Sequence, residues 1–488
     1  MKTFFLHFFP ALGYLLLALF ILLLLLLAAA VIHTLFMPSK TSGYKAPPAD
    51  DYASELAKKL SAMIRYDTTS HPNTDEAEKF SGFHKILEAL FPLVHTRLER
   101  TVIDGNLLYY WKGKSRENPI LLMSHQDVVP AEGTWKHEPF SGDIADGKVW
   151  GRGASDTKCS VMAFFQAVEE LLQNDYTPAC DVYLASSCTE EWGGDGAPKI
   201  VSELKRRGVK LFLVCDEGGG IITDPIGGIS GNFAMVGVFE KGKADVKFTA
   251  RSAGGHASAP TSNTPIPKLA AFVNDIEKHS PFRKKFLPEV SAMFIRLAPY
   301  APFALKLVFG NLWLFKPILK NVLGKISAQA GAMLQTTIAF TMQSGSDACN
   351  VLPQEASVSA NMRFIPHQGE KESLSIIKHA AEQHGLEMEV LASNDYSEPV
   401  DINGNAFHQI EQVIAETFPG LPVSPYVMTG ATDAHFYQSI CPSCIRFAPV
   451  VYGPEQMKGM HGLNENIEYN CFPGAVAFYK NLIRIQES

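Results

Sequence analysis

Three apolar runs of this chain each lead into a charged residue, and this pattern restricts the fold more than any other feature. The runs and their charged residues are 120–123 with His125, 182–185 with Glu190, and 211–214 with Asp216. Charged groups seldom follow buried strands unless a partner compensates them. In an open α/β sheet, the carboxyl ends of the strands border a ligand crevice. The pattern therefore predicts an α/β fold with a mainly parallel sheet, whose strand ends bring histidine and carboxylate side chains together.

The composition excludes several classes of protein. Of the 488 residues, 46% are hydrophobic and 19% are charged, which indicates a folded chain rather than a disordered one. The formal net charge of −7 gives no sign of a nucleic-acid partner. The eight cysteines include no recurring Cys-x-x-Cys pair, which argues against a structural zinc knuckle. We interpret the one close pair, Cys441 and Cys444, as structural thiols or a local disulfide, with a redox role less favoured.

Residues 10–32 contain no charged residue and predict a membrane segment. The stretch reaches the roughly 20 residues that cross a bilayer, whereas the apolar part of a cleaved signal peptide is usually about 7–15 residues long. We therefore favour an uncleaved single-pass anchor, with a signal segment as the alternative. Flanking charges are too few for the positive-inside rule to decide the orientation. The short tail before the segment favours an exported catalytic domain, in the periplasm, in a lumen or outside the cell.

The rest of the chain alternates between two kinds of pattern. Residues 38–52 are typical of a linker. Strand-like and helical runs then alternate over residues 53–238 and resume over residues 398–488, as in a parallel α/β catalytic domain. Residues 239–397 instead show the β-α-β-β-α-β order of a ferredoxin-like unit. The simplest architecture is a discontinuous catalytic domain into which a small lid or dimerisation domain is inserted.

Apolar periodicity places several elements within this plan. Helices are expected over residues 51–64, 159–173, 265–279 and 371–383, and strands of the inserted domain over residues 244–251, 336–341, 356–364 and 387–391.

Residues 281–335 exceed the minimal plan of the inserted domain. This insertion is apolar and basic, and its eight lysines and arginines are accompanied by one acidic residue, Glu289. One interpretation is an enlarged core of the inserted domain with a solvated face. The other is an amphipathic surface that meets membrane lipid or a lipophilic substrate.

Seven short blocks follow one another in a specific order between about residue 50 and the C-terminus. They are Leu-Leu-Met-Ser-His-Gln-Asp-Val-Val-Pro at 121–130, Trp-Lys-His-Glu-Pro-Phe-Ser-Gly at 135–142, Val-Trp-Gly-Arg-Gly-Ala-Ser-Asp-Thr-Lys at 149–158, Thr-Glu-Glu-Trp-Gly-Gly at 189–194, Gly-Gly-His-Ala-Ser at 254–258, Asn-Val-Leu-Pro at 350–353, and Gly-Leu-Asn-Glu-Asn at 462–466. With this ordered set, the chain resembles the di-zinc metallopeptidases that include aminoacylase, carboxypeptidase S, acetylornithine deacetylase and succinyl-diaminopimelate desuccinylase. The anchor and the sequence Asn-Leu-Trp-Leu-Phe at 311–315 look closest to the carboxypeptidase S branch, which includes secreted enzymes that make and hydrolyse N-fatty-acyl amino acids.

The resemblance implies a cofactor of two zinc ions and a set of ligands. Asp156 would bridge both ions. His125 and Asp216 would complete the first ion, and Glu191 and His461 the second. Imidazole nitrogen and carboxylate oxygen are ligands that zinc accepts, at about 2.0–2.2 Å.

Two further residues receive catalytic roles from the resemblance. Glu190 would be the general base, which takes a proton from the attacking water and passes it to the leaving amine. Asp127 would hold His125 in the tautomer that binds metal. The resemblance also predicts a cis peptide bond between Asp156 and Thr157.

The inserted domain and one loop supply the remaining candidates. The resemblance implies that His256 stabilises the oxyanion, commonly from the neighbouring subunit, and that Asn350 and Arg363 bind substrate. Arg363 would fork onto a carboxylate. The loop that contains Gly430 and Asp433 would line the pocket.

The function implied by the resemblance is a zinc-dependent hydrolase that cleaves an amide bond next to a free carboxylate. Its substrate would be a peptide or an N-acyl amino acid, and a small-peptide dipeptidase is the alternative. A catalytically inactive, membrane-anchored interaction module is less favoured, because no ligand or base is missing. The expected partners are the small-molecule substrate, a membrane through the N-terminal helix, and a second copy in a homodimer.

Overall fold

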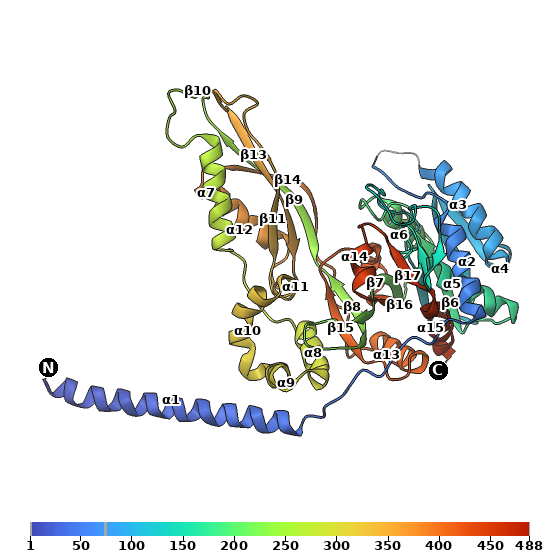
Figure 1. Ribbon diagram of the computed structural model, residues 1–488, viewed down its shortest axis with the longest axis horizontal. Coiled ribbons are helices and arrows are strands. Elements are labelled where there is room, and N and C mark those ends of the chain that lie inside the picture. The colour runs from blue at the N-terminus through green and yellow to red at the C-terminus, as the bar shows by residue number, and fades with distance from the viewer. Residues whose placement is uncertain (1, 73–75, 488) are drawn as a thin grey trace.

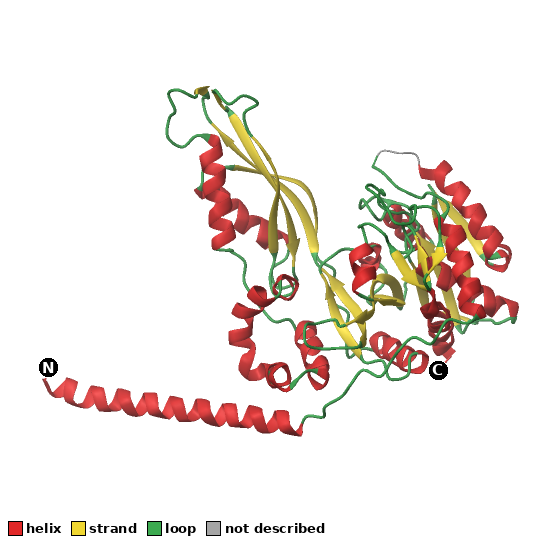
Figure 2. Cartoon of the chain, in the orientation of Figure 1, coloured by secondary structure: helices red, strands yellow, loops and turns green. Residues whose placement is uncertain are grey.

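The computed structural model describes residues 2–72 and 76–487. Figure 1 shows a long N-terminal helix that projects from a body built mainly on two larger sheets, while β4 Ile144–Ala145, β5 Lys148–Trp150 and β17 Asn466–Glu468 form a small third one. Figure 2 shows helices against both faces of the larger sheet and against one face of the second sheet, with the strands drawn in yellow.

The main sheet has eight strands in the order β1-β2-β6-β3-β7-β16-β8-β15. Their bounds are β1 Glu99–Ile103, β2 Asn106–Trp111, β3 Ser115–Met123, β6 Cys180–Ser186, β7 Leu213–Thr223, β8 Asn232–Glu240, β15 Val423–Met428 and β16 Cys444–Tyr452. The centre is parallel, since β3 runs parallel to both β6 and β7, and β7 runs parallel to β16. Antiparallel strands lie at one edge, where β1 pairs with β2 and β2 with β6. This mixed sheet with a mostly parallel centre agrees with the predicted α/β class.

Helices pack on both faces of the main sheet because each carries an apolar stripe. They are α2 Asp51–Ile64, α3 Glu76–Leu90, α4 Pro92–Arg97, α5 Lys158–Gln173, α6 Gly196–Arg206, α13 Asn405–Thr417, α14 Pro454–Gly459 and α15 Phe472–Arg484. Helix α2 has the predicted bounds, and Asp50 caps it by accepting from the Ala53 backbone N–H at 2.7 Å. Helix α5 is buried almost all round, which places the loop before it deep in the molecule.

The second sheet has four antiparallel strands in the order β11-β13-β9-β14. These are β9 Gly242–Arg251, β11 Thr337–Ser344, β13 Glu355–Phe364 and β14 Glu387–Asn394, with α7 Pro265–Lys278 and α12 Glu370–Gln383 packed against them. Alternate residues of β9, from Ala244 to Ala250, are buried in a core of their own, as the period of a one-sided strand requires. At the tip, β10 Gly255–His256 pairs with β12 Val351–Leu352.

The apolar-basic insertion forms four helices, α8 Pro288–Leu297, α9 Phe303–Gly310, α10 Leu312–Ile326 and α11 Ala328–Ala332. Helix α8 packs on β15, and its residues Val290, Met293 and Phe294 belong to the core cluster of the main sheet. The insertion therefore extends the main core, and the core of the second sheet is separate from it.

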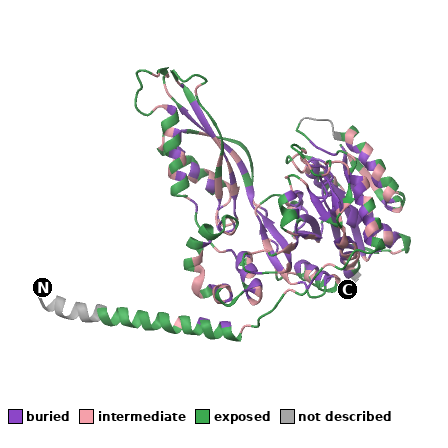
Figure 3. Cartoon of the chain, in the orientation of Figure 1, coloured by how far each residue is buried: buried purple, intermediate pink, exposed green. Residues whose placement is uncertain are grey.

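The N-terminal helix α1 spans Lys2–Phe36, and its segment Gly13–Phe36 is long and apolar enough to cross a membrane, with a mean hydropathy of 3.4. Figure 3 shows that its described side chains are almost all exposed. An anchor and a signal sequence both fit such a helix. The segment that follows it has no regular structure, yet it packs along the body, where the Tyr44 ring meets Phe418 edge-on at 5.5 Å.

Candidate metal centre

The carboxyl ends of the central strands bring the predicted polar residues to one place. His125 follows β3, Glu190 and Glu191 follow β6, and Asp156 lies in the loop before α5. One potential ligand atom from each of His125, Asp156 and Glu191 lies within 4.8 Å of the other two. The strand-end pattern in the sequence thus corresponds to a cluster in space.

Asp156 lies between two histidines and presents a different oxygen to each. Its Oδ1 is 3.2 Å from His125 Nε2, and its Oδ2 is 3.2 Å from His461 Nε2. His461 Nε2 is also 3.0 Å from Glu191 Oε2. A carboxylate that divides its oxygens between two ligand groups is suited to bridge two cations.

Asp127 is fully buried and contacts His125 and the backbone of Glu190 and Glu191. The Nδ1 of His125 lies 3.0 Å from the Asp127 backbone carbonyl and 3.4 Å from its carboxylate. The same carboxylate accepts from the Ser70 hydroxyl at 2.6 Å and from the backbone N–H groups of Glu190 and Glu191 at 3.3 and 3.2 Å. A contact at Nδ1 leaves Nε2 of His125 as the nitrogen that faces Asp156.

Glu465, a residue that the analysis of the sequence passed over, fixes the loop that carries Asp156. Its buried carboxylate accepts from the backbone N–H groups of Gly153, Ser155 and Asp156 at 3.0, 2.9 and 3.0 Å. It also pairs with the buried Arg152 guanidinium at 2.8 Å. Its place in the Gly-Leu-Asn-Glu-Asn block at 462–466 is the signal by which it could have been found. The Asp156–Thr157 peptide in this loop is cis, which confirms that prediction.

The structure brings Glu217, rather than the predicted Asp216, to the cavity beside His125. Glu217 lines the same cavity as His125, Asp156 and Glu190, whereas Asp216 does not line it. Successive residues of a strand point to opposite faces, so only one of the pair can face the cavity. Asp216 Oδ1 accepts the Glu217 backbone N–H at 2.9 Å, and one carboxylate oxygen of each residue is buried without a hydrogen-bond partner among the described residues.

The electrostatics of the cluster favour a cation. Burial, together with neighbouring carboxylates, raises the pKa values of Glu190 and Glu217 well above the ordinary range, although His125 opposes both shifts. Burial, reinforced by Asp216 and Asp127, raises the pKa of Asp433 to about 7. Buried carboxylates in such number are costly unless positive charge compensates them, and the donor set of imidazoles and carboxylates suits divalent metal ions.

The candidates of the second domain lie away from this cluster. His256 is exposed in β10, at the tip of the second sheet farthest from the main sheet in Figure 1. Asn350 is exposed beside it, and its carbonyl accepts the Ala257 backbone N–H at 2.9 Å. In the register of strands β13 and β9, Arg363 lies opposite Lys243, near the junction of the two domains. In a single chain, therefore, His256 and Asn350 do not join the strand-end cluster.

Two cavities meet at Glu190, and most of their other lining residues differ. The first, which we call the apolar cavity, has a volume of about 440 Å³ and reaches from His125, Asp156 and His461 into an apolar region. Side chains from β8, β15, β16 and the α14 segment line that region, namely Met235, Tyr426, Met428, Tyr452, Met457 and Met460. No pattern in the sequence links these residues, because they come from separate elements. Methionines adapt their shape to irregular apolar partners.

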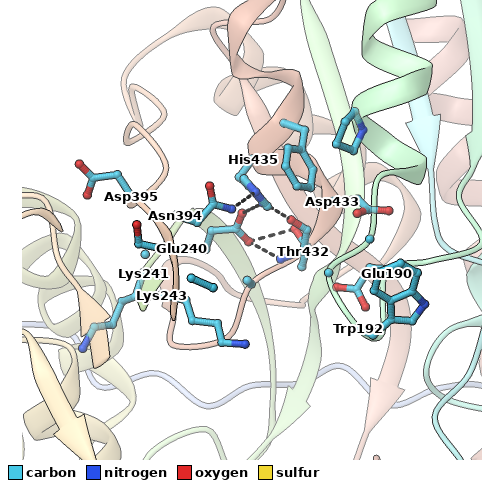
Figure 4. Close-up of a pocket in the computed structure, with 18 of the residues that line it drawn as sticks. Glu190, Trp192, Glu240, Lys241, Lys243, Asn394, Asp395, Thr432, Asp433 and His435 are labelled. Carbon is cyan, nitrogen blue, oxygen red and sulfur yellow. Dashed lines mark hydrogen bonds and ion pairs between the residues drawn. The ribbon is translucent and has the colours of Figure 1, made fainter. Parts of the chain in front are cut away.

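The second, which we call the polar cavity, has a volume of about 780 Å³ and lies between the two domains. More than half of its lining residues are charged or polar, and they include Lys241, Lys243, Asp245, Asn394, Asp395 and His435. Figure 4 shows Lys243 reaching into the cavity, whereas Lys241 points away from it. The amine of Lys241 donates instead to the carbonyls of Ala332 and Gln335, at 2.9 and 2.8 Å.

The predicted pocket loop follows β15 and belongs to both cavities. Ala431 and Thr432 line both of them, and Asp433 lines the polar cavity. Gly430 immediately precedes these residues and is exposed. The Asp433 carboxylate accepts from the Ser187 hydroxyl, and the Thr432 backbone N–H donates to Glu240 at 2.6 Å. Glu240 in turn lies 3.2 Å from His435 and from Arg446, so the loop is fixed by buried polar contacts.

Comparison with known proteins connects this geometry to a family. The family model described as "Peptidase family M20/M25/M40" matches residues 121–485. The N-fatty-acyl-amino acid synthase/hydrolase PM20D1 of Xenopus tropicalis is 34% identical over 448 residues, which cover 89% of this chain and 86% of that protein. A probable carboxypeptidase S-like protein 2 of Dictyostelium discoideum is 32% identical over 445 residues, which cover 89% and 85%.

Solved structures share the fold at low sequence identity. An M20 family metallo-carboxypeptidase of Sulfolobus solfataricus superposes with a TM-score of 0.67 at 18% identity, covering 90% of this chain and 99% of that one. Human carnosine dipeptidase 1 superposes with a TM-score of 0.63 at 14% identity, covering 90% and 98%. The matched family model, the relatives above 30% identity and the clustered strand-end residues agree, and this chain belongs to peptidase family M20/M25/M40 as one of its metallopeptidases.

Proposed function

We propose that this protein hydrolyses N-acyl amino acids that carry a long apolar acyl chain. Its relatives include carboxypeptidases and N-acyl amino acid hydrolases, and all of these reactions break an amide bond next to a free carboxylate. The observation that carries the choice of substrate is the position of Glu190, which lines both the apolar and the polar cavity. An amide bond held at Glu190 would place one half of the substrate in each cavity.

The cofactor we propose is a pair of zinc ions bridged by Asp156. Glu191 and His461 would hold one ion, and His125 with a carboxylate of β7 would hold the other. The resemblance assigns that carboxylate to Asp216, whereas the exposure of Glu217 to the cavity favours Glu217. When bound, the ions would supply Lewis-acid chemistry and a more acidic water.

Glu190 is the proposed general base. It lies 3.9 Å from His125 Nε2 and is not tied to a second ligand group as Glu191 is, so its carboxylate is available to the attacking water. It would take the proton of that water and transfer it to the leaving amine nitrogen. Asp127 would act as a positioning residue, since it holds the His125 ring and the backbone of both glutamates.

The two cavities suit the two halves of the substrate. The apolar cavity falls within the usual range of about 300–1,000 Å³ for small-molecule sites, and its methionines fit a flexible hydrocarbon chain. On the other side, Lys243 offers a cation to the carboxylate of the amino acid, and Arg363 lies directly opposite it on the neighbouring strand. A dipeptide would leave much of the apolar cavity empty.

We further propose that the second domain acts as a lid and dimerisation domain, and that His256 and Asn350 complete the site of a partner subunit. Both residues are exposed at the far tip of that domain, where they contact each other's segments rather than the strand-end cluster of their own chain. A chain with His256→Ala mixed with a chain with Glu190→Gln should then recover activity in heterodimers. Full activity of a strictly monomeric enzyme would exclude a shared site.

The proposed location is a membrane, with helix α1 as a single-pass anchor and the catalytic domain exported. The support is the length and apolarity of Gly13–Phe36. Accessibility of the exposed Cys349 to a membrane-impermeant thiol reagent in intact cells tests the orientation.

The substrate is tested by measuring zinc content and kcat/KM together on one preparation of the full chain. N-acyl amino acids with two to eighteen acyl carbons are compared with dipeptides and with amino acid amides that lack the free carboxylate. We expect kcat/KM to rise with acyl length and to fall when the carboxylate is capped. Faster cleavage of dipeptides would instead support a small-peptide dipeptidase, and an inactive, zinc-free protein would support an interaction module.

A further inference from the structure

The loop that carries Asp156 is shaped around the carboxylate of one distant residue. This loop, residues 151–157 between β5 and α5, contains neither helix nor strand. Three of its backbone N–H groups converge on the fully buried Glu465, whose Oε1 also accepts from the Ser155 hydroxyl at 3.1 Å. Convergent backbone N–H groups are a general way to bind an anion. Here the anion belongs to a segment that lies 309 residues after Asp156 in the chain.

The same distant segment carries His461, and further contacts join it to the loop. The Gly151 backbone N–H donates to the Glu465 carbonyl at 2.9 Å. The Arg152 guanidinium reaches across, since its Nη1 is 2.8 Å from Glu465 Oε2 and its Nη2 donates to the Gly462 carbonyl at 2.9 Å. We call these two side chains the Arg152–Glu465 clamp. The clamp therefore connects the loop of Asp156 to the residue next to His461.

His461 depends on its backbone more than His125 does. The His125 side chain is 2% exposed and contacts Asp127 through Nδ1, whereas the His461 side chain is 59% exposed. Because packing supports a half-exposed imidazole poorly, the backbone that carries His461 must fix its position. Helix α14 holds that backbone on one side, where the Met460 N–H donates to the Gln456 carbonyl at 3.1 Å. The Arg152–Glu465 clamp holds it on the other side.

Stability alone does not account for the clamp. Glu465 is fully buried and Arg152 is 2% exposed. The cost of taking two charges out of water offsets most of their attraction, so packed apolar side chains often give equal stability. The best attested use of a buried polar contact is to fix the register of the segments that it joins. The segments joined here bring Asp156 Oδ2 and His461 Nε2 to 3.2 Å from each other.

We propose that the Arg152–Glu465 clamp holds Asp156 and His461 at the spacing of a shared metal site before any ion binds. The proposal rests on the metal centre proposed above and adds two positioning residues to it. Contacts that orient metal ligands commonly contribute about 10–100-fold to metal affinity. Because His125 is held from β3 by other contacts, the clamp should act mainly on the site that contains His461.

The test is titration of the metal-free full chain with Co²⁺, whose visible absorption reports each binding step, and with Zn²⁺ in competition with a chelator. His461→Ala identifies the step that depends on this histidine. Arg152→Lys keeps a positive charge beside Glu465 but lacks the fork that also holds Gly462, so this step should weaken by about 10-fold. Glu465→Gln places an amide donor against the N–H groups of the loop, so the same step should weaken by about 100-fold.

Glu169→Gln is the matched control. Glu169 is also a buried carboxylate, and it accepts from the backbone N–H groups of Leu93 and Val94 at 3.0 and 2.9 Å. Its substitution should lower Tm equally with and without metal and should leave both binding steps unchanged. In the clamp variants, the rise of Tm on adding metal should shrink, because a ligand stabilises the folded chain according to its affinity. This difference separates positioning of the metal site from a general loosening of the fold.

Wild-type affinity at both steps in folded Arg152→Lys and Glu465→Gln variants would overturn the inference and leave the proposed metal centre intact. Weakening confined to the step that His461→Ala spares, or equal weakening by Glu169→Gln, would also overturn it. A wild-type chain that binds a single ion would contradict the proposed pair of zinc ions, and the inference with it. If Glu465→Gln fails to fold, Arg152→Lys decides the question, since it leaves the Glu465 carboxylate in place.

Discussion

The apolar and polar cavities share Glu190, Ala431 and Thr432, yet their other lining residues come from different parts of the chain. The apolar cavity is built mostly from strands and α14 of the main domain, with Gln329 of α11 added from the insertion, and one of its walls holds His125, Asp156 and His461. The polar cavity lies between two domains and takes Lys243 and Asp245 from β9 and Asn394 from the end of β14. If the proposed function is right, different parts of the chain recognise the two halves of the substrate.

This division has a mechanical consequence. Met235 and Tyr452 of the apolar cavity belong to the main core and would keep their positions if the second domain moved. The polar cavity changes its shape whenever the two domains move relative to each other, since both domains line it. We therefore expect acyl-chain selectivity to be a property of the main domain alone, and carboxylate recognition to depend on domain closure.

The largest effect on activity is expected from substitution of Glu190, which lines both cavities. Glu190→Gln should lower kcat by about 10²–10⁴-fold, the usual contribution of general acid–base catalysis, while substrate and metal binding persist. Because Glu190 belongs to both cavities, the loss should be equal for long and short acyl chains. Steady-state kinetics with metal analysis checks this, and a near wild-type kcat would place the base elsewhere.

The next effect concerns the carboxylate of β7 that we propose as a metal ligand. Glu217→Gln should weaken metal binding by at least about 10–100-fold, the loss that even an outer partner of a ligand can cause. Asp216→Asn is the matched control, since the two residues are adjacent and only Glu217 lines the cavity. Titration of the metal-free variants with zinc measures the difference. A larger loss with Asp216→Asn would restore the assignment that the family resemblance implies.

A narrower apolar cavity should penalise long acyl chains only. Met457 lines this cavity and is 48% exposed, so Met457→Trp fills space without disturbing the core. Each methylene that no longer fits should lower kcat/KM by about fourfold, which corresponds to about 0.8 kcal/mol. The control is Met342→Trp, at a 70% exposed position of β11 outside both cavities. An equal loss for acetyl and palmitoyl substrates would contradict the assignment of the acyl chain to this cavity.

The smallest effect is expected on the polar side. Lys243→Met should raise KM about fivefold for substrates with a free carboxylate, since a partly exposed ion pair contributes about 1 kcal/mol. Lys247→Met, four residues further along the same face of β9, provides the control. If Lys243→Met raises KM equally for a substrate with a capped carboxylate, the lysine supports the cavity wall instead of binding the substrate.

The sequence predicted what local patterns encode. The spacing of apolar residues predicted α2 at its observed bounds, and the strand-end charges predicted the cluster around Asp156. The sequence could not predict whether Asp216 or Glu217 faces the cavity. Which side chain of a strand faces which side of the sheet depends on how β7 pairs with β3 and β16. The sequence could not predict the apolar cavity either. Its lining residues Met235, Met428 and Met457 are not close together in the chain, and the fold brings them together.

The insertion shows the same limit. Its apolar and basic composition was plain in the sequence, and the sequence left a choice between a core and an amphipathic surface. In the structure, α8 enters the core of the main domain while α10 stays exposed, so the amphipathic membrane or substrate surface stays a prediction. Helices α8 and α10 have similar apolar and basic compositions, so composition alone could not predict which of them is buried. Burial depends on which other elements each helix packs against.

The most direct test of the two-cavity account is a double-mutant cycle on kcat/KM with Met457→Trp, Lys243→Met and their combination. Four substrates are compared, with a long or a short acyl chain and with a free or a capped carboxylate. The account predicts that Met457→Trp acts only through acyl length, that Lys243→Met acts only through the free carboxylate, and that the two losses add in the double variant. Losses that both follow the same half of the substrate would contradict it.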